Sequence, residues 1–249
     1  MKRYFSIPII CMIMVCIGCT GANKMRVPMA EIDRPIVDPK GTWSSHPLIN
    51  AYLIATDTVT YRGVNWVALL FPTSAYSLTN NLSIALPSNS LRPTLTWQLT
   101  KSPLIDSGAR YKWQIALSAD YGMNGAQAND YYGSLRIITK KLLSNSVWYS
   151  GGIYSFYKRL NENHTIYGNI FNGLGFQVSE KADVVMSLGL TIPDYHKFTT
   201  REDENIAAYG NFNFHYSFVP WFGINIGSSL GTYKGSTQME MSGSTEFYW

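Results

Sequence analysis

The sequence predicts an all-β protein: a transmembrane, antiparallel, up-and-down β-barrel of about twelve strands, with ten as the alternative count. Three observations favour this fold. Apolar and polar residues alternate with a period of two over long stretches, and no helical period of useful length competes. Most of these stretches reach the roughly 9–11 residues that a tilted strand needs to cross a bilayer. Charged residues are only 14% of the chain, against about one quarter in typical soluble domains.

The first nineteen residues predict an export signal. Lys2 and Arg3 precede an apolar run that is shorter than the roughly 20 residues of a membrane-spanning helix. Cys19 follows a small residue at the end of this run, which resembles a bacterial lipoprotein signal. The resemblance implies lipidation at Cys19, with ordinary cleavage near Ala22 as the alternative. All three cysteines lie in this segment, so we expect no disulfide and no cysteine metal site in the folded part.

Residues 20–40 are expected to form a periplasmic linker, because Pro28, Pro35 and Pro39 interrupt any regular element. The run from Arg34 to Trp43 resembles the lead-in to the first strand of small, transporter-like outer-membrane proteins of bacteria. The barrel itself is predicted to occupy residues 41–249.

Twelve strands are expected between the linker and the C-terminal residue. Their predicted bounds are 42–56, 64–77, 82–87, 94–100, 111–121, 131–142, 147–158, 165–178, 183–195, 205–218, 221–233 and 237–249. Alternation is clearest in the C-terminal half, whereas both faces are mixed in 64–77 and 147–158, so their register stays open. Short and long connections alternate along most of the chain, as tight periplasmic turns and longer outer loops do in outer-membrane barrels.

The last strand carries the most specific signal. One face holds Met239, Met241, Phe247 and Trp249, and the other holds Glu240, Glu246 and Tyr248. This ending resembles the terminal strand of bacterial outer-membrane β-barrels, in which the final aromatic belongs to the assembly signal. The resemblance implies that Phe247 and Trp249 form that signal, that the barrel assembly machinery is a partner, and that the protein resides among the lipids of the outer membrane of a Gram-negative-type bacterium.

A soluble β-sandwich or lipocalin-like barrel is the alternative that alternation alone permits. Two observations disfavour it. The polar faces consist mostly of Ser, Asn, Gly and Thr rather than of charges, and the strands exceed the usual soluble length of about 5–6 residues. Trp and Phe are also expected at the periplasmic ends of the strands and Tyr at the outer ends, as in the two aromatic belts of a membrane protein.

Five charged residues are predicted to face the lumen: Lys112, Asp120, Arg136, Glu240 and Glu246. Lys140 is expected to join them on the strand of Arg136. A barrel of about twelve strands has a narrow lumen, so opposite charges inside it would either cross-link the walls or line a small pore. An internal salt-bridge network is the first interpretation and a selectivity ring is the second.

No motif for catalysis or for a cofactor was found. The four histidines are scattered, no paired Cys or His spacing indicates a metal site, and no glycine-rich nucleotide loop occurs. A net charge of +4 without a basic aromatic tract excludes a nucleic-acid footprint. The sequence therefore predicts a non-enzymatic barrel, foremost a narrow passive channel for small solutes. A closed structural or surface-interaction barrel is the second hypothesis, and a lipid-active enzyme is the third.

Overall fold

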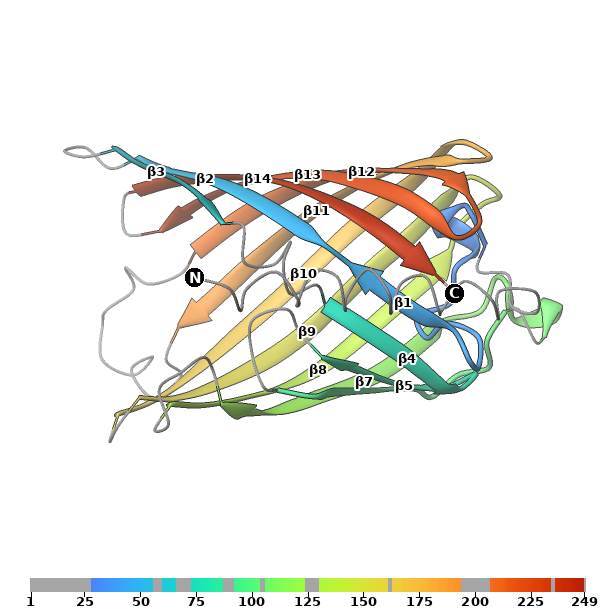
Figure 1. Cartoon of the computed structure of the whole chain (residues 1–249), viewed down its shortest axis with the longest axis horizontal. Helices are drawn as coiled ribbons and strands as arrows, with labels where there is room; N and C mark the ends of the chain where they lie inside the picture. Colours follow the sequence, from blue (N-terminus) through green and yellow to red (C-terminus); the bar gives the residue numbers. More distant parts are fainter. Residues whose placement is uncertain are drawn as a thin grey trace, which may run out of the picture.

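The computed structural model describes residues 28–55, 60–65, 73–86, 92–103, 106–123, 130–160, 163–193, 207–233 and 236–248. The chain forms one antiparallel sheet that closes on itself (Figure 1). The strands are β1 Trp43–His46, β2 Leu48–Ala55, β3 Thr60–Asn65, β4 Thr73–Thr79, β5 Leu82–Leu86, β6 Thr94–Gln98, β7 Gln114–Met123, β8 Asp130–Leu142, β9 Val147–Leu160, β10 Asn163–Ser179, β11 Ala182–Pro193, β12 Ala207–Val219, β13 Phe222–Tyr233 and β14 Ser236–Tyr248. Two short 3₁₀ turns, η2 Glu31–Asp33 and η3 Ser107–Ala109, lie outside the sheet.

The fourteen segments make twelve barrel strands. β1 and β2 are one strand interrupted at Pro47, because both pair with β14. β3 pairs with β2 and β4 pairs with β1, so they are successive parts of the second strand. The barrel closes where Phe247 of β14 lies opposite Ser45 of β1. The predicted fold class, the strand count and the pairing of first and last strands are confirmed.

Most predicted strand bounds agree with the structure to within a few residues. The largest difference concerns the second strand, which begins at Thr60 in β3 rather than at residue 64. β7 begins at Gln114 rather than at residue 111, because Tyr111 and Lys112 lie in a turn. The connection expected at 159–164 is also shorter than predicted, since β9 extends to Leu160 and β10 begins at Asn163.

The outer wall is apolar. Exposed large hydrophobic side chains occupy one face of the strands from β4 to β14, including Trp97, Ile137, Ile153, Leu174, Met186, Leu188, Phe212, Ile226, Leu230, Met239 and Met241. An uncovered surface of this kind suits hydrocarbon rather than water, because apolar area in contact with water is costly. The opposite faces carry the buried polar residues, so the lumen is polar. None of the helical turns among the described residues is long and apolar enough to cross a membrane.

The two ends of the barrel differ. Tight turns join β4 to β5, β8 to β9, β10 to β11 and β12 to β13 at the end where the C-terminal strand finishes, which we call the short-turn end (Figure 1). Aromatic rings surround this end on the outside. The rings of Phe218 and Phe222 stack with their centroids 5.4 Å apart, and the centroids of Phe222 and Phe247 are 5.1 Å apart. Trp113 packs edge-on against Tyr149. They form the aromatic belt that the sequence predicts there.

Candidate functional site

Residues 28–40, which we call the plug segment, lie across the lumen at the short-turn end (Figure 1). Its hydrogen-bond partners come from six strands distributed around the barrel: β6, β7, β8, β11, β12 and β14. This corrects the expectation of a linker for these residues. The prolines do prevent a helix or strand here, but the barrel wall supplies the hydrogen bonds that the segment cannot make internally.

The segment enters β1 through a sharp turn at Gly41. The backbone φ of Gly41 is +84°, a left-handed conformation that glycine adopts without steric cost. The turn is held on both sides: the Gly41 amide donates to the Ser77 carbonyl at 2.8 Å, and the Thr42 amide donates to the Pro39 carbonyl at 3.1 Å. The chain can therefore pass directly from the lumen into the barrel wall at β1.

Arg34 is the principal polar anchor of the plug segment. Its Nη1 donates to Glu246 Oε2 at 2.9 Å and to the Tyr248 hydroxyl at 3.0 Å, and its Nη2 donates to Ser217 Oγ at 3.2 Å. Its Nε donates to the carbonyl of Pro28 at 2.9 Å, which folds the segment back on itself. Burial alone would lower the pKa of Arg34, but Glu31 and Glu246 raise it above its ordinary value, so the guanidinium stays charged.

Lumen side chains also hold the backbone of the plug segment. Asp183 accepts the Glu31 amide at 2.8 Å, and Lys140 Nζ donates to the Arg34 carbonyl at 2.7 Å. Further along, the side-chain oxygens of Gln114 and Gln98 accept the amides of Ile36 at 3.3 Å and Val37 at 3.1 Å. The wall thus satisfies backbone groups that burial would otherwise leave unpaired.

The segment has an apolar anchor as well. Ile32, which is fully buried, packs with Ala30, Leu142 and Trp148. Trp148 lies flat against the backbone of the next strand, where a Cβ on Gly175 would stand 2.0 Å from its ring. Only glycine leaves room there for the indole that supports Ile32.

A second charged cluster lies in the lumen beyond the plug. Asp120 Oδ2 accepts Ser134 Oγ at 2.6 Å and Arg136 Nη2 at 3.1 Å, and Asp120 Oδ1 lies 3.7 Å from Arg92 Nη1. Arg136 and Lys140 are four residues apart on β8, so the cluster lies about 13 Å along the strand from the plug contacts. A cavity of about 520 Å³ opens beside it, lined by Arg92, Tyr132, Arg136, Tyr154, Phe156, Tyr167 and Thr191.

The structure distributes the predicted lumen charges over different places. Asp120 and Arg136 form an ion pair, and Glu246 pairs with Arg34. Glu240 faces the same side of β14 as Glu246 but is exposed toward the other end of the barrel. Lys112 is exposed in the turn before β7 and does not belong to the lumen wall, so this expectation was wrong. Phe247 packs in the aromatic belt, whereas Cys19 and Trp249 lie outside the described residues.

Four functional residues were missed by sequence reasoning. Arg34 lies in a segment without periodicity, and Arg92 precedes β6, so no strand pattern could orient either side chain. Asp183 and His215 face each other on neighbouring strands, with Asp183 Oδ2 and His215 Nδ1 3.5 Å apart. Their alternation did place them on the polar face, which was the available signal.

His215 and Ser217 raise the question of nucleophilic catalysis. The Ser217 Oγ lies 3.3 Å from His215 Nε2, and Asp183 lies behind the imidazole, as in a serine–histidine–aspartate arrangement. However, Ser217 Oγ already donates to the Met29 carbonyl at 2.8 Å and accepts from Arg34. The same Nε2 faces Glu246 at 3.3 Å, so these groups are engaged with the plug segment. Among the described residues, no group of His, Cys, Asp and Glu could hold a metal ion.

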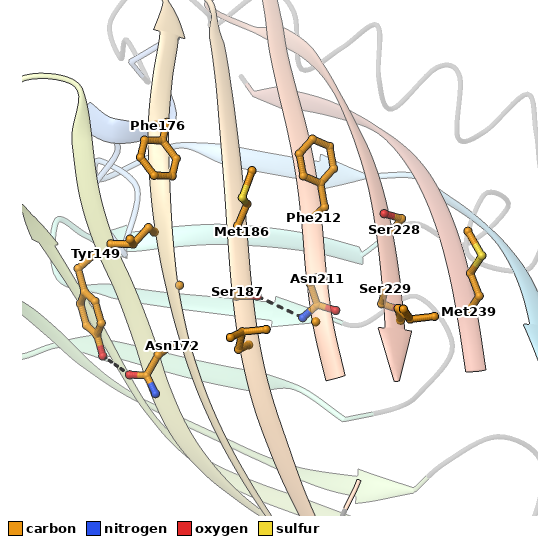
Figure 2. A pocket seen from close by; sticks show the side chains of 15 residues that line it. Tyr149, Asn172, Phe176, Met186, Ser187, Asn211, Phe212, Ser228, Ser229 and Met239 are labelled. Atoms are coloured by element: carbon orange, nitrogen blue, oxygen red, sulfur yellow. Dashed lines mark hydrogen bonds between the residues drawn. The ribbon is translucent and has the colours of Figure 1, made fainter. Parts of the chain in front are cut away.

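A groove larger than the lumen cavity lies on the outer wall. It measures about 800 Å³ and crosses β9 to β14, with Leu174, Met186, Phe212 and Met239 among its walls (Figure 2). Tyr149 donates its hydroxyl to Asn172 Oδ1 at 2.5 Å at its edge, so two polar groups on the lipid-facing side satisfy each other. We regard this groove as a surface that lipid chains fill.

No family model matches the chain, and no curated protein does so. Solved structures of β-barrels do match. An outer membrane channel from Pseudomonas putida F1 is 10% identical, with a TM-score of 0.53 over 85% of this chain and 96% of that one. The translocator domain of the autotransporter NalP from Neisseria meningitidis is 10% identical, with a TM-score of 0.44 over 84% of this chain and 89% of that domain. The NanC porin is 9% identical, with a TM-score of 0.46 over 84% of this chain and 99% of the porin. With the apolar outer wall, the first likeness identifies the fold as that of a bacterial outer-membrane β-barrel.

Proposed function

We propose that this barrel is a narrow passive channel for small solutes, and that the plug segment closes its periplasmic mouth. In outer-membrane barrels the tight turns face the periplasm, so the short-turn end is the periplasmic one. The single observation that carries the proposal is the arrangement of the lumen: a polar cavity stands open on one side of a segment that the wall holds mainly through side chains.

The contacts of the plug segment support a movable closure. Among the described residues it joins the wall covalently at Gly41. Besides the apolar anchor Ile32, it is held by hydrogen bonds to Asp183 and Lys140 and by an ion pair with Glu246. The hydrogen bonds can be exchanged for water at modest net cost, so one ion pair and one apolar side chain are the main contacts that opening must break. A wall of twelve strands without the segment would leave a lumen intermediate between filled small barrels and the wide porins.

We propose passive transport through the barrel rather than catalysis in it. Ser217 is buried beneath the plug segment, and a substrate carbonyl would need the space that the Met29 carbonyl and Arg34 occupy. We further propose that Phe247, packed on Phe222 at the periplasmic rim, is read by the assembly machinery together with Trp249, and that Cys19 is lipidated.

Liposome swelling tests the proposal. Vesicles that contain the full-length protein, and vesicles that contain a variant lacking residues 28–40, are placed in isosmotic solutions of solutes of increasing size. We expect slow swelling with the full chain and several-fold faster, size-limited swelling with the variant. If neither protein admits even the smallest solute, although both show the far-UV spectrum of a folded barrel, the closed structural or surface-interaction barrel is the better account.

A further inference from the structure

We propose that the 520 Å³ lumen cavity is a binding site for small monoanionic carboxylates that carry an aromatic or similarly planar apolar body. This inference rests on the proposed channel and names the class of solute that its lumen would select. It follows from three features of the cavity: the charge it presents, the rings that line it and its size.

The cavity presents positive charge although it contains an acidic neighbour. Arg92 and Arg136 both line it, whereas Asp120 does not. The Asp120 side chain is only 2% exposed and lies behind the two guanidinium groups, while the side chain of Arg136 is 42% exposed. Two guanidinium groups therefore face the cavity while the carboxylate between them does not, and the more exposed of them, Arg136, is placed to meet the carboxylate of a solute.

The geometry of Arg136 suits a carboxylate. Its Nε donates to Ser134 Oγ at 3.1 Å and its Nη2 donates to Asp120 Oδ2 at 3.1 Å, so one edge of the guanidinium is fixed by the wall. The planar fork of arginine binds carboxylates with directed, charge-assisted hydrogen bonds. A guanidinium held on one edge is already oriented and loses little rotamer freedom when the solute binds.

The remaining walls are aromatic. The Arg92 guanidinium carbon lies 5.4 Å from the centre of the Tyr132 ring and 5.7 Å from that of Phe156, and Arg136 lies 5.9 Å from the Tyr154 ring. Phe156 in turn packs on Tyr167 at 6.1 Å. The rings offer apolar edges and faces to a flat solute body, which a hydrated inorganic anion could not use.

The size of the cavity fits one small molecule. A volume of about 520 Å³ falls within the usual range of roughly 300–1,000 Å³ for ligand pockets. Thr191 adds a hydroxyl at the wall, and Asn169 donates to Thr191 Oγ1 at 2.8 Å while accepting from the Tyr209 hydroxyl. Thr191 is thus held in place by the wall and is the one neutral aliphatic polar side chain among the residues that line the cavity.

Isothermal titration calorimetry on the full-length protein in detergent tests the site directly. Four probes are compared: benzoate, its neutral analogue benzamide, acetate, and inorganic phosphate. We expect benzoate to bind and the other three to bind at least about tenfold more weakly, the loss expected for one charge-assisted hydrogen bond or for an unfilled aromatic wall. Equal binding of phosphate and benzoate would overturn the proposal in favour of a general anion site.

Variants separate the site from unspecific attraction. Arg136→Gln should weaken benzoate binding about tenfold or more, and Arg136→Lys should recover only part of it because lysine lacks the fork. Lys112→Gln is the matched control: it also removes one cation, but from an exposed turn, and should leave benzoate binding unchanged. If Lys112→Gln weakens binding as much as Arg136→Gln, net charge rather than the cavity attracts the solute, and the inference is wrong.

The outcome is distinguishable from failure of the channel itself. Benzoate binding without any solute flux would retain the site and refute the channel. Flux through the barrel lacking residues 28–40 without preferential benzoate binding would retain the channel and refute the site.

Discussion

Arg34 Nη1 and Glu246 Oε2 are 2.9 Å apart, although 212 positions separate the two residues in the chain. The pair joins the first described segment to the last strand, and both side chains are almost completely buried. It therefore reports directly whether the plug segment occupies the lumen. The predictions that follow concern this occupancy, its pH dependence and the membrane setting of the barrel.

Arg34→Met should release the plug segment. The substitution removes the arginine partner of buried Glu246 and leaves it only His215 Nε2 at 3.3 Å and the Tyr248 hydroxyl, and breaking one partner of a buried ion pair costs up to about 3–5 kcal/mol. Trypsin should then cleave the folded protein after Lys40 at least tenfold faster, because Lys40 is exposed and the backbone that follows it is no longer held. The double variant Arg34→Met/Glu246→Met should be cleaved more slowly than Arg34→Met, since it also removes the buried carboxylate that Arg34 no longer neutralises. Equal cleavage of the wild type and Arg34→Met would contradict this role for the pair.

Ile32→Ala should weaken the apolar anchor of the plug segment. Removing a fully buried isoleucine side chain costs about 2–4 kcal/mol, from lost transfer energy and from the cavity left against Trp148. The rate at which trypsin cleaves after Lys40 again measures the effect. Ile36→Ala is the matched control in the same segment, because Ile36 is only half-buried and should cost much less. An equal effect of the two substitutions would show that Ile32 does not anchor the segment.

The closure should weaken as pH rises through about 6. Burial raises the pKa of Asp38 from 3.8 to about 6, against the lowering effect of Arg34. A carboxyl whose pKa is raised in the docked state favours docking while it is protonated, so its contribution is complete below pH 3.8 and is lost above pH 6.

Conductance measured between pH 4.5 and 7.5 checks this prediction. The open fraction should increase with pH in the wild type, and Asp38→Asn should reduce the increase because its neutral side chain does not titrate. An unchanged pH profile in Asp38→Asn would assign the titration to another group.

Leu188→Arg should impair insertion into lipid. Leu188 lies near the middle of β11 on the outer wall and is 74% exposed. An arginine on the lipid-facing side of a barrel costs about 2–4 kcal/mol near the bilayer midplane. Folding of each variant into lipid vesicles, followed by urea titration, gives the difference in the free energy of unfolding between the variant and the wild type. Ser187 faces the polar lumen, so Ser187→Arg should lower the free energy of unfolding less than Leu188→Arg does. A larger loss for Ser187→Arg would mean that the two faces are assigned incorrectly.

Strand architecture was accessible from the sequence because alternation reports burial residue by residue. The period of two in β10 to β14 identified both faces, and the same period in β7 and β8 brought Asp120 and Arg136 to the same side of neighbouring strands before any coordinates were known. The failure at Lys112 has a local cause: the alternation of residues 111–121 extends past the true start of β7 into a turn, and periodicity does not register where pairing stops.

The plug segment could not be predicted in the same way. Glu246 was expected to need a partner, but its partner Arg34 lies in a proline-interrupted stretch whose conformation depends on the wall around it. The anchors Gln98, Gln114, Lys140 and Asp183 become a set only after the barrel has closed, because they come from four different strands. Tertiary context rather than local preference decides the position of such a segment.

Single-channel recording in a planar bilayer tests the central claim most directly. Full-length protein and Arg34→Met are compared at equal protein density, with Lys112→Met as a control that removes a cation from an exposed turn. We predict rare, brief openings for the wild type and for Lys112→Met, and long openings of a single small conductance for Arg34→Met. Absence of conductance above background in all three, with correctly folded protein in the membrane, would contradict a channel closed by residues 28–40.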